Sequence, residues 1–248
     1  MAIKKARLDL ALVERGLVPT RAKAQSLIMA RRVLVNGAHR DKPGFSVTDE
    51  DELAIEELEH PWVGRGGMKL AAALERFQID PEGLTCLDIG ASTGGFTDVL
   101  LQKGARRVYA VDVGHGQLDQ KLREDPRVVN REKTNARNLL AEDFEEPIDL
   151  ISIDVSFISL RLILPAAAKI LPRGGKLVAL VKPQFEVGKG EVGRGGIVRD
   201  EDLRRAAISG IVDFASENGF ETTGTIDSPV RGAEGNLEAL LYAVRTEC

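Results

Sequence analysis

The stretch Leu87-Asp88-Ile89-Gly90-Ala91-Ser92-Thr93-Gly94-Gly95-Phe96-Thr97 decides the fold of this chain. An apolar run at 84–89 predicts a buried strand, and a helical pattern begins near Gly95. Glycines allow a backbone to approach a ligand closely, and the start of a helix favours negative groups. Asp112 ends the next predicted strand, where a carboxylate can accept hydrogen bonds from two ribose hydroxyls. We therefore expect a nucleoside-containing ligand at this turn.

From residue 68 onward, predicted strands alternate with helical patterns. Strands are expected at 84–89, 107–112, 128–129, 148–154, 176–181, 220–226 and 238–245, and helices at 68–77, from 95, at 160–171 and at 201–218. This alternation predicts a largely parallel sheet with helices on both faces. No helical pattern separates the last two strands, so the final strand is expected to be antiparallel. The predicted fold class is α/β, with a Rossmann-like sheet of seven strands.

The first part of the chain has a different pattern, that of a small α+β head. Short helical stripes occur at 7–15 and after Thr20, and strands are expected at 33–35 and 53–55. Residues 59–67 hold Pro61 and three glycines, as linkers often do. We therefore divide the chain into a head at 1–58, a linker at 59–67 and a second domain at 68–248.

Charge is distributed unevenly along the chain. Residues 1–42 hold ten Lys and Arg against three Asp and Glu, a balance of +7, whereas the whole chain is at −4 and the remainder therefore at −11. A basic head on an acidic body indicates a polyanion-binding module. The alternative is a solvated basic surface that binds nothing.

Composition excludes several classes of protein. Hydrophobic residues make up 43% and charged residues 29%, which argues against fibrous and wholly disordered chains. No apolar run approaches the ~20 residues of a spanning helix, and no secretory signal follows the N-terminus. Cys86 and Cys248 cannot form a disulfide framework, and His39, His60 and His115 are too scattered for a metal cluster. We expect a cytoplasmic protein without a metal site and without a membrane partner.

Four charged residues are expected at the edge of the sheet where ligands bind. Asp154 and Lys182 stand at the carboxyl ends of two predicted strands, and open α/β sheets bind ligands at that edge. Lys69 opens the helix after the linker, and Glu238 begins the last strand. The sequence predicts that these side chains lie beside the glycine turn.

The sequence segments around these residues are similar to those of a known family. Asp88-x-Gly90-x-x-x-Gly94-Gly95 resembles the S-adenosylmethionine motif of class I methyltransferases more than the dinucleotide motif G-x-G-x-x-G. Lys69, Asp154, Lys182 and Glu238 follow the order of the Lys-Asp-Lys-Glu tetrad of FtsJ-like RNA ribose 2′-O-methyltransferases.

Three longer sequence segments make the resemblance specific to the TlyA family. The resemblance covers nearly the whole chain. They are Trp62-Val63-Gly64-Arg65-Gly66-Gly67-Met68-Lys69-Leu70, Asp154-Val155-Ser156-Phe157-Ile158-Ser159-Leu160 and Val181-Lys182-Pro183-Gln184-Phe185-Glu186. In the head, Arg7-Leu8-Asp9, Arg21-x-x-Ala24, Arg31 and Val33-x-Val35-Asn36-Gly37 resemble an S4 RNA-binding domain. Gly64 and Gly67 depart from the family, in which many members have Ser and a larger residue, so we expect a more flexible linker here.

The resemblance implies an S-adenosylmethionine-dependent methyltransferase that modifies the ribose 2′ hydroxyl of a cytidine in ribosomal RNA, with ribosomal RNA or ribosomal subunits as partners. The cofactor would be bound by Asp88, Gly90, Ser92, Thr93, Gly94, Gly95, Phe96, Asp112, Val113, Asn135, Ala136 and Asp154. The RNA would be bound by Arg7, Arg21, Lys23, Arg31, Arg32 and Arg65.

The tetrad roles follow from what the reaction needs. A ribose hydroxyl is a poor nucleophile until a base within hydrogen-bond reach takes its proton, and we assign that base to Lys182. An ordinary lysine is almost wholly protonated near neutral pH, so burial and a second cation, Lys69, are expected to favour the neutral amine. Asp154 would orient Lys182 and stabilise the sulfonium methyl. Lys69 and Glu238 would position the ribose and each other.

Three other functions remain open. The family often carries a haemolysin label, which would mean a membrane-active protein. The glycine turn also allows an NAD-dependent oxidoreductase, and the head allows an RNA-binding protein without catalysis. Base-amine methylation is disfavoured, because Lys182-Pro183-Gln184-Phe185 stands where those enzymes have Asn/Asp-Pro-Pro-Tyr.

Overall fold

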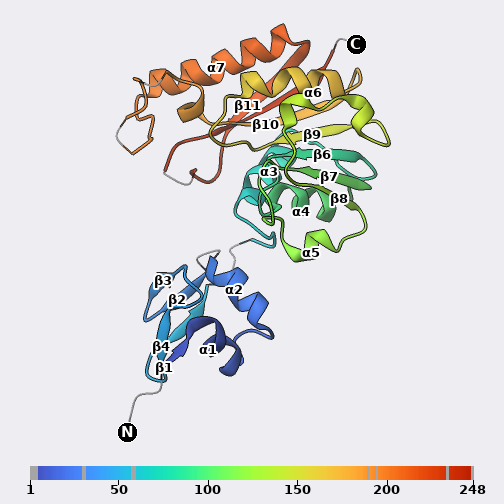
Figure 1. Cartoon of the computed structure of the whole chain (residues 1–248). Coiled ribbons are helices and arrows are strands. Elements are labelled where there is room, and N and C mark those ends of the chain that lie inside the picture. Colours follow the sequence, from blue (N-terminus) through green and yellow to red (C-terminus); the bar gives the residue numbers. More distant parts are fainter. Residues whose placement is uncertain are drawn as a thin grey trace. The chain divides into compact units, whose positions relative to one another are not determined.

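The computed structural model of this chain forms two compact units, residues 1–61 and 62–248 (Figure 1). It describes residues 5–29, 32–56, 60–188, 190–193, 195–232 and 235–246. No helix in these described ranges is long and apolar enough to cross a membrane.

Within its described residues, the first unit contains two helices and five very short strands. They are β1 (Lys5–Arg7), α1 (Leu8–Glu14), α2 (Arg21–Met29), β2 (Val33–Val35), β3 (Ala38–Arg40), β4 (Ser46–Thr48) and β5 (Leu53–Ile55). β2 pairs antiparallel with both β3 and β5, and β1 pairs antiparallel with β4. The helices pack on these strands through Leu8, Leu12, Ile28, Val33 and Val47. The predicted helices and the strands at 33–35 and 53–55 are confirmed. The other three strands were not predicted, because each holds only one apolar residue.

The second unit is a seven-stranded sheet with helices on both faces. Its helices are α3 (Gly66–Arg76), α4 (Gly95–Gln102), α5 (Gln120–Arg123), α6 (Leu164–Ile170) and α7 (Glu201–Glu217). Its strands are β6 (Thr85–Ile89), β7 (Arg107–Val111), β8 (Val128–Arg131), β9 (Leu150–Ile153), β10 (Lys176–Val181), β11 (Phe220–Asp227) and β12 (Ala239–Arg245). The strand order is β11-β12-β10-β9-β6-β7-β8, and β12 pairs antiparallel with both of its neighbours. The predicted sheet with an antiparallel final strand is confirmed.

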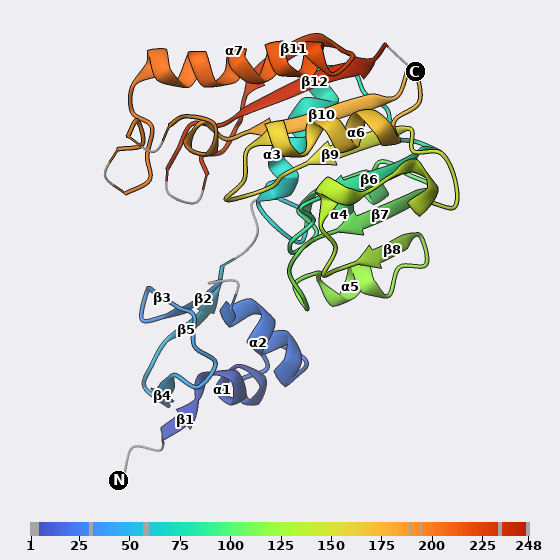
Figure 2. The same cartoon turned by 45° about the horizontal axis from the view of Figure 1, so that its top comes forward.

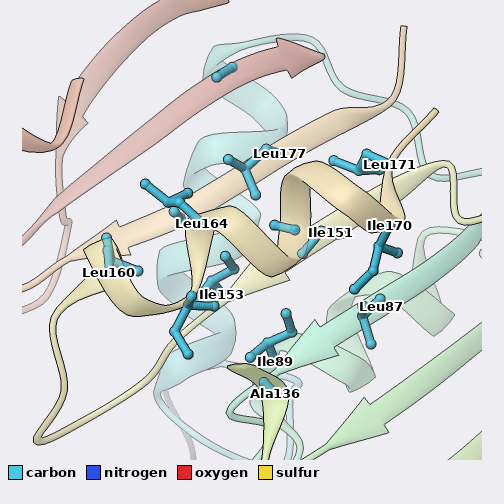
Figure 3. Packing of buried hydrophobic residues seen from close by; sticks show 14 of the residues in the cluster. Leu87, Ile89, Ala136, Ile151, Ile153, Leu160, Leu164, Ile170, Leu171 and Leu177 are labelled. Atoms are coloured by element: carbon cyan, nitrogen blue, oxygen red, sulfur yellow. The ribbon is translucent and has the colours of Figure 1, made fainter. Parts of the chain in front are cut away.

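The strands are buried on both sides, so two separate cores form. On one face, Leu87 and Ile89 of β6 belong to a cluster that includes α6 and α7. Figure 3 shows Leu164 and Ile170 of α6 lying over this cluster. On the other face, Cys86 packs with residues of α3 and α4, and Figure 2 shows these helices behind the sheet. Because β6 lies between these two cores, all five of its residues are buried.

The boundary between the units lies inside the linker expected at 59–67. Trp62 and Val63 pack against the second core, and the Val63 N–H donates a 2.9 Å hydrogen bond to Asp98 Oδ2. A Cβ on Gly67 would lie 2.7 Å from Cγ of Trp62, so the missing side chain lets the indole lie on the first turn of α3. Residues 62–67 therefore belong to the second unit and are not a free linker.

Candidate active site

A cavity of about 590 Å³ opens at the carboxyl edge of the sheet in the second unit. Lys69, Asp154, Lys182 and Glu238 all line it, as does the glycine turn from Gly90 to Phe96 apart from Gly94. Cavities of this size hold small-molecule ligands in many proteins. The four charged residues that the sequence places at one sheet edge are thus brought together.

The glycine turn has a backbone that other residues would not adopt easily. Gly90 and Gly94 have φ of +84° and +99°, values that strain any residue with a side chain. A Cβ on Gly90 would lie 2.4 Å from the Asp154 carbonyl oxygen, and one on Gly94 would lie 2.1 Å from Leu122 Cδ1. The two glycines therefore let the turn pack closely against the end of β9 and against α5.

Asp88 supports this turn from inside the protein. Its side chain is fully buried, and its carboxylate accepts hydrogen bonds from Thr97 Oγ1 at 2.7 Å and from Ser152 Oγ at 3.0 Å. Burial raises the pKa of Asp88 to about 7, and the two hydroxyl donors oppose that rise. Asp88 was expected to bind the cofactor; in the structure its side chain has no exposed surface and ties α4 and β9 to β6.

Asp112 directly follows β7 and lies outside the lining of the cavity, but its carboxylate contacts the glycine turn. Its two carboxylate oxygens accept hydrogen bonds from the N–H groups of Ser92, at 2.8 Å, and Gly114, at 2.7 Å. Each oxygen has a further lone pair, so ribose hydroxyls can still be accepted. Thr134 N donates to the Asp112 carbonyl at 2.9 Å and thereby connects the segment holding Asn135 and Ala136 to this side of the turn. The expected cofactor residues Val113, Asn135 and Ala136 lie outside the lining of the cavity.

Glu132 is a residue of this region that the sequence analysis missed. Its carboxylate accepts hydrogen bonds from Gln117 N at 2.9 Å and from Arg123 Nη2 at 2.5 Å, and His115 Nδ1 lies 3.3 Å away. The backbone N–H groups of this loop, foremost that of Gly116, hold the pKa of Glu132 well below its usual range. Glu132 thus fixes the loop that follows Asp112. Its signal in the sequence is weak, because one acid after a strand is common.

The first of two ion pairs that the described residues form in the cavity joins Lys69 to Glu238. The Lys69 Nζ and Glu238 Oε2 atoms are 2.5 Å apart, and the two side chains are 11% and 2% exposed. A Cβ on Gly232 would lie 2.4 Å from Glu238 Oε1, so this glycine makes room for the carboxylate. The expectation that Lys69 and Glu238 position each other agrees with this contact.

The second ion pair joins Lys182 to Asp154. Lys182 Nζ lies 2.7 Å from Asp154 Oδ1 and donates a 2.8 Å hydrogen bond to Ser156 Oγ. We expected Lys69 to act as a second cation on Lys182; in the structure Lys69 pairs with Glu238. The charge that Lys182 meets is the Asp154 carboxylate. Ser156 is a further contact of Lys182 that the sequence analysis did not single out.

Phe157 is an exposed aromatic residue at this cavity. Its side chain is 92% exposed, its φ is +63°, and its ring centroid lies 5.3 Å from that of Phe185. Both rings line the cavity. An exposed Phe in a backbone conformation that is rare for bulky residues indicates a functional surface. In the sequence, its presence in the segment Asp154-Val155-Ser156-Phe157, which resembles the family, was the feature that could have pointed to it.

The predicted RNA-binding residues fall into several groups. In the first unit, Arg7 and Arg21 both bind the buried carboxylate of Asp9 and remain half exposed. Arg32 Nη2 donates to the Glu56 carbonyl at 2.7 Å, and Lys23 is exposed. Arg31 lies outside the described residues. Arg65 belongs to the second unit, where it lines the cavity.

The charge asymmetry lies within the first unit, not between the units. Residues 43–61 hold seven Asp and Glu and no Lys or Arg, so residues 1–61 contain ten of each sign. The unit therefore has no net charge, and the second unit holds the whole −4. The expected basic head is thus a basic segment within a neutral unit.

Comparison with known proteins agrees with this site. A model of the FtsJ-like methyltransferase family matches residues 62–245, and a model of the S4 domain matches residues 6–53. The 16S/23S rRNA (cytidine-2′-O)-methyltransferase TlyA of Mycobacterium tuberculosis is 47% identical over 98% of this chain and 91% of its own length. The chain belongs to the TlyA family of FtsJ-like methyltransferases.

Other relatives of this TlyA-family chain carry a hemolysin name. Hemolysin A of Brachyspira hyodysenteriae is 42% identical over 96% of this chain and 99% of its own length. A Streptococcus thermophilus structure solved under a hemolysin name matches 99% of this chain and 90% of its own with a TM-score of 0.77 at 46% identity. The fold also matches an S-adenosylmethionine-dependent methyltransferase of Listeria monocytogenes, with a TM-score of 0.55 at 15% identity over 74% of this chain and all of that one.

The chain is an S-adenosylmethionine-dependent methyltransferase. The glycine turn, the cavity beside it and the Asp112 carboxylate fit this cofactor. The NAD-dependent oxidoreductase that the turn left open is thereby set aside.

Proposed function

We propose that this chain transfers the methyl group of S-adenosylmethionine to the ribose 2′ hydroxyl of a cytidine in ribosomal RNA. The observation that carries the proposal is the joining of Lys69, Asp154, Lys182 and Glu238 as two ion pairs in the cavity beside the glycine turn. The cytidine and the ribosomal RNA come from the substrate named for the Mycobacterium tuberculosis relative. The setting of this activity is then the cytoplasm, where ribosomal subunits are the partner.

The second unit would hold the cofactor through main chain and one carboxylate. The turn from Gly90 to Gly95 offers close backbone approach, and Asp112 offers acceptors for ribose hydroxyls. When bound, the cofactor supplies a methyl group on a positively charged sulfonium, which is a strong electrophile.

Lys182 is the base of the proposed reaction. As a neutral amine it accepts the 2′ hydroxyl proton at Nζ, and the oxygen becomes a nucleophile. The ammonium that results has the Asp154 carboxylate 2.7 Å away, so the developing positive charge is stabilised. The hydrogen bond to Ser156 Oγ limits the rotation of Nζ. Asp154 and Ser156 therefore orient the base and stabilise its protonated form.

Lys69 and Glu238 have a different part in this proposal. Their charges cancel within a nearly buried pair, so they can donate to and accept from a ribose without adding net charge to the cavity. The exposed ring of Phe157 offers an apolar surface on which a nucleobase can stack. Together these groups would place the 2′ oxygen within reach of Lys182.

Transfer of labelled methyl groups tests this function. The full chain is incubated with methyl-labelled S-adenosylmethionine and purified 30S and 50S subunits that lack the modification. Label in ribosomal RNA supports the proposal, and its loss with Lys182→Met supports the assigned base. Binding of the cofactor without label in any RNA would overturn the proposal.

A further inference from the structure

A buried carboxylate lies beneath two of the basic side chains of the first unit. Asp9 is in the first turn of α1 and is fully buried. Arg7 donates from Nε to Asp9 Oδ1 at 2.9 Å and from Nη2 to Oδ2 at 3.1 Å, which is a two-point contact. Arg21 Nε and Gln25 Nε2 each donate to Oδ2 at 2.9 Å. One acid thus holds two guanidinium groups.

The contacts of Asp9 are strongly ionic, and yet its two arginines remain accessible to solvent. The hydrogen bond from Arg7 foremost, with those from Gln25 and Arg21, holds the pKa of Asp9 well below its usual range. The side chains of Arg7 and Arg21 nevertheless remain 49% and 53% exposed. Of the donors that they direct to Asp9, Arg7 uses two nitrogens and Arg21 one. Among the described residues, Nη1 of Arg7 and both Nη groups of Arg21 have no hydrogen-bond acceptor, so they can bind another one.

These remaining donors suit phosphate. A guanidinium presents N–H groups in a planar fork that matches phosphate oxygens, and most protein–RNA affinity comes from such backbone contacts. Because two cations share one acid, the cluster has a net charge of +1 on its exposed side. An arginine already fixed by a buried partner loses little side-chain freedom when it binds a phosphate.

We propose that Asp9 is a positioning residue for RNA binding, which fixes the guanidinium groups of Arg7 and Arg21 so that their free N–H groups bind phosphates of the ribosomal RNA. This inference rests on the proposed RNA substrate. It differs from a charge effect, since Asp9 itself is negative and would weaken binding of a polyanion. A pure charge effect predicts that removing the Asp9 carboxylate strengthens RNA binding, whereas the positioning role predicts that its removal weakens RNA binding.

The test compares two substitutions that change the charge equally. Asp9→Asn removes the charge beneath the arginines, whereas Asp41→Asn removes the charge of an exposed acid. The full chain is titrated with purified 16S and 23S ribosomal RNA at several salt concentrations. Asp9→Asn is expected to weaken binding about three- to tenfold, the effect of releasing one or two fixed side chains. It should also lower the slope of log affinity against log salt by about 1 to 2. Asp41→Asn should bind as tightly as the parent chain or more tightly.

The outcomes separate this inference from the proposed function. If the parent chain binds ribosomal RNA and Asp9→Asn binds as tightly as Asp41→Asn, the positioning role is overturned alone. If the parent chain binds no ribosomal RNA, the proposed substrate fails and the inference falls with it. Should thermal melting show Asp9→Asn unfolded, Arg21→Lys replaces it, because lysine keeps the charge without the fork. Binding that Arg21→Lys leaves unchanged would then overturn the inference.

Discussion

The two units use ion pairs in opposite ways. In the first unit, one buried acid, Asp9, serves two arginines that remain half exposed. In the cavity of the second, Lys69 and Lys182 each have their own carboxylate, and the pair of Lys69 and Glu238 is almost wholly buried. An excess of exposed cation suits the binding of a polyanion, whereas balanced pairs in a cavity suit the movement of a proton. The same residue types therefore serve binding in one place and chemistry in the other.

The largest effect is expected when the pair of Lys182 and Asp154 is broken. Lys182→Met should lower methyl transfer by about 10²- to 10⁴-fold, the usual contribution of a general base, while cofactor binding persists. Lys182→Arg is the matched control, because arginine can pair with Asp154 but does not lose its proton. Single-turnover rates and cofactor titration measure both effects. Full activity of Lys182→Arg would show that Lys182 is not the base.

The buried pair of Lys69 and Glu238 should matter to folding as well as to activity. Glu238→Gln leaves the Lys69 ammonium buried without a counter-charge, which should lower the free energy of unfolding by about 3 kcal/mol. Asp202→Asn breaks an exposed pair with Arg205 and should cost less than about 1 kcal/mol. Urea unfolding of both variants measures the difference. Equal costs would contradict the contrast between buried and exposed pairs.

Asp88 should make the second unit less stable as pH rises. Its pKa is about 7 in the folded chain against an ordinary 3.8, so the folded state keeps a proton that the unfolded state has lost. The resulting stability is complete below pH 3.8 and decreases up to pH 7, by at most about 4 kcal/mol. Asp88→Asn should remove this part of the pH dependence. Parallel stability curves for the two chains between pH 4 and 7 would contradict it.

The smallest effect concerns a carboxylate that holds a loop. Glu132→Gln weakens the contacts with Arg123 and the loop backbone, so the dissociation constant of S-adenosylmethionine should rise about fivefold, or ~1 kcal/mol. The turnover number at saturating cofactor should not change. Glu124→Gln is a control in the same region, because Glu124 is exposed and accepts only from Gln120 among the described side chains. Calorimetric titration distinguishes the two variants.

Much of the second unit could be predicted from the sequence because its strands are long and buried. The strand at 176–181 was predicted with its observed ends, and the missing helix before β12 revealed its antiparallel direction. In the first unit, β1, β3 and β4 were missed, since each holds a single apolar residue, whereas β2 and β5, of equal length, are wholly apolar. Residues 62–67 were predicted as part of a linker, but they pack within the second unit. The packing of Trp62 on Gly67 is a tertiary contact that composition does not show.

The site could be predicted as a set, and the expected roles already joined Lys69 to Glu238 and Asp154 to Lys182. Strand ends place Asp154 and Lys182 at one edge of the sheet, and the family resemblance adds Lys69 and Glu238. The distances and the burial of the two ion pairs are what the structure adds. Asp9 was quoted as part of a motif, yet its burial between two arginines could not be foreseen from a helical stripe.

The position of the transferred methyl group tests the central claim most directly. Ribosomal RNA labelled by the full chain is hydrolysed with alkali, which requires a free 2′ hydroxyl beside each cleaved phosphodiester. The account predicts that the label remains in an alkali-resistant dinucleotide whose 5′ member is a 2′-O-methylated cytidine. Label released in mononucleotides would place the methyl group on a base and would contradict the assignment of the four residues to ribose methylation.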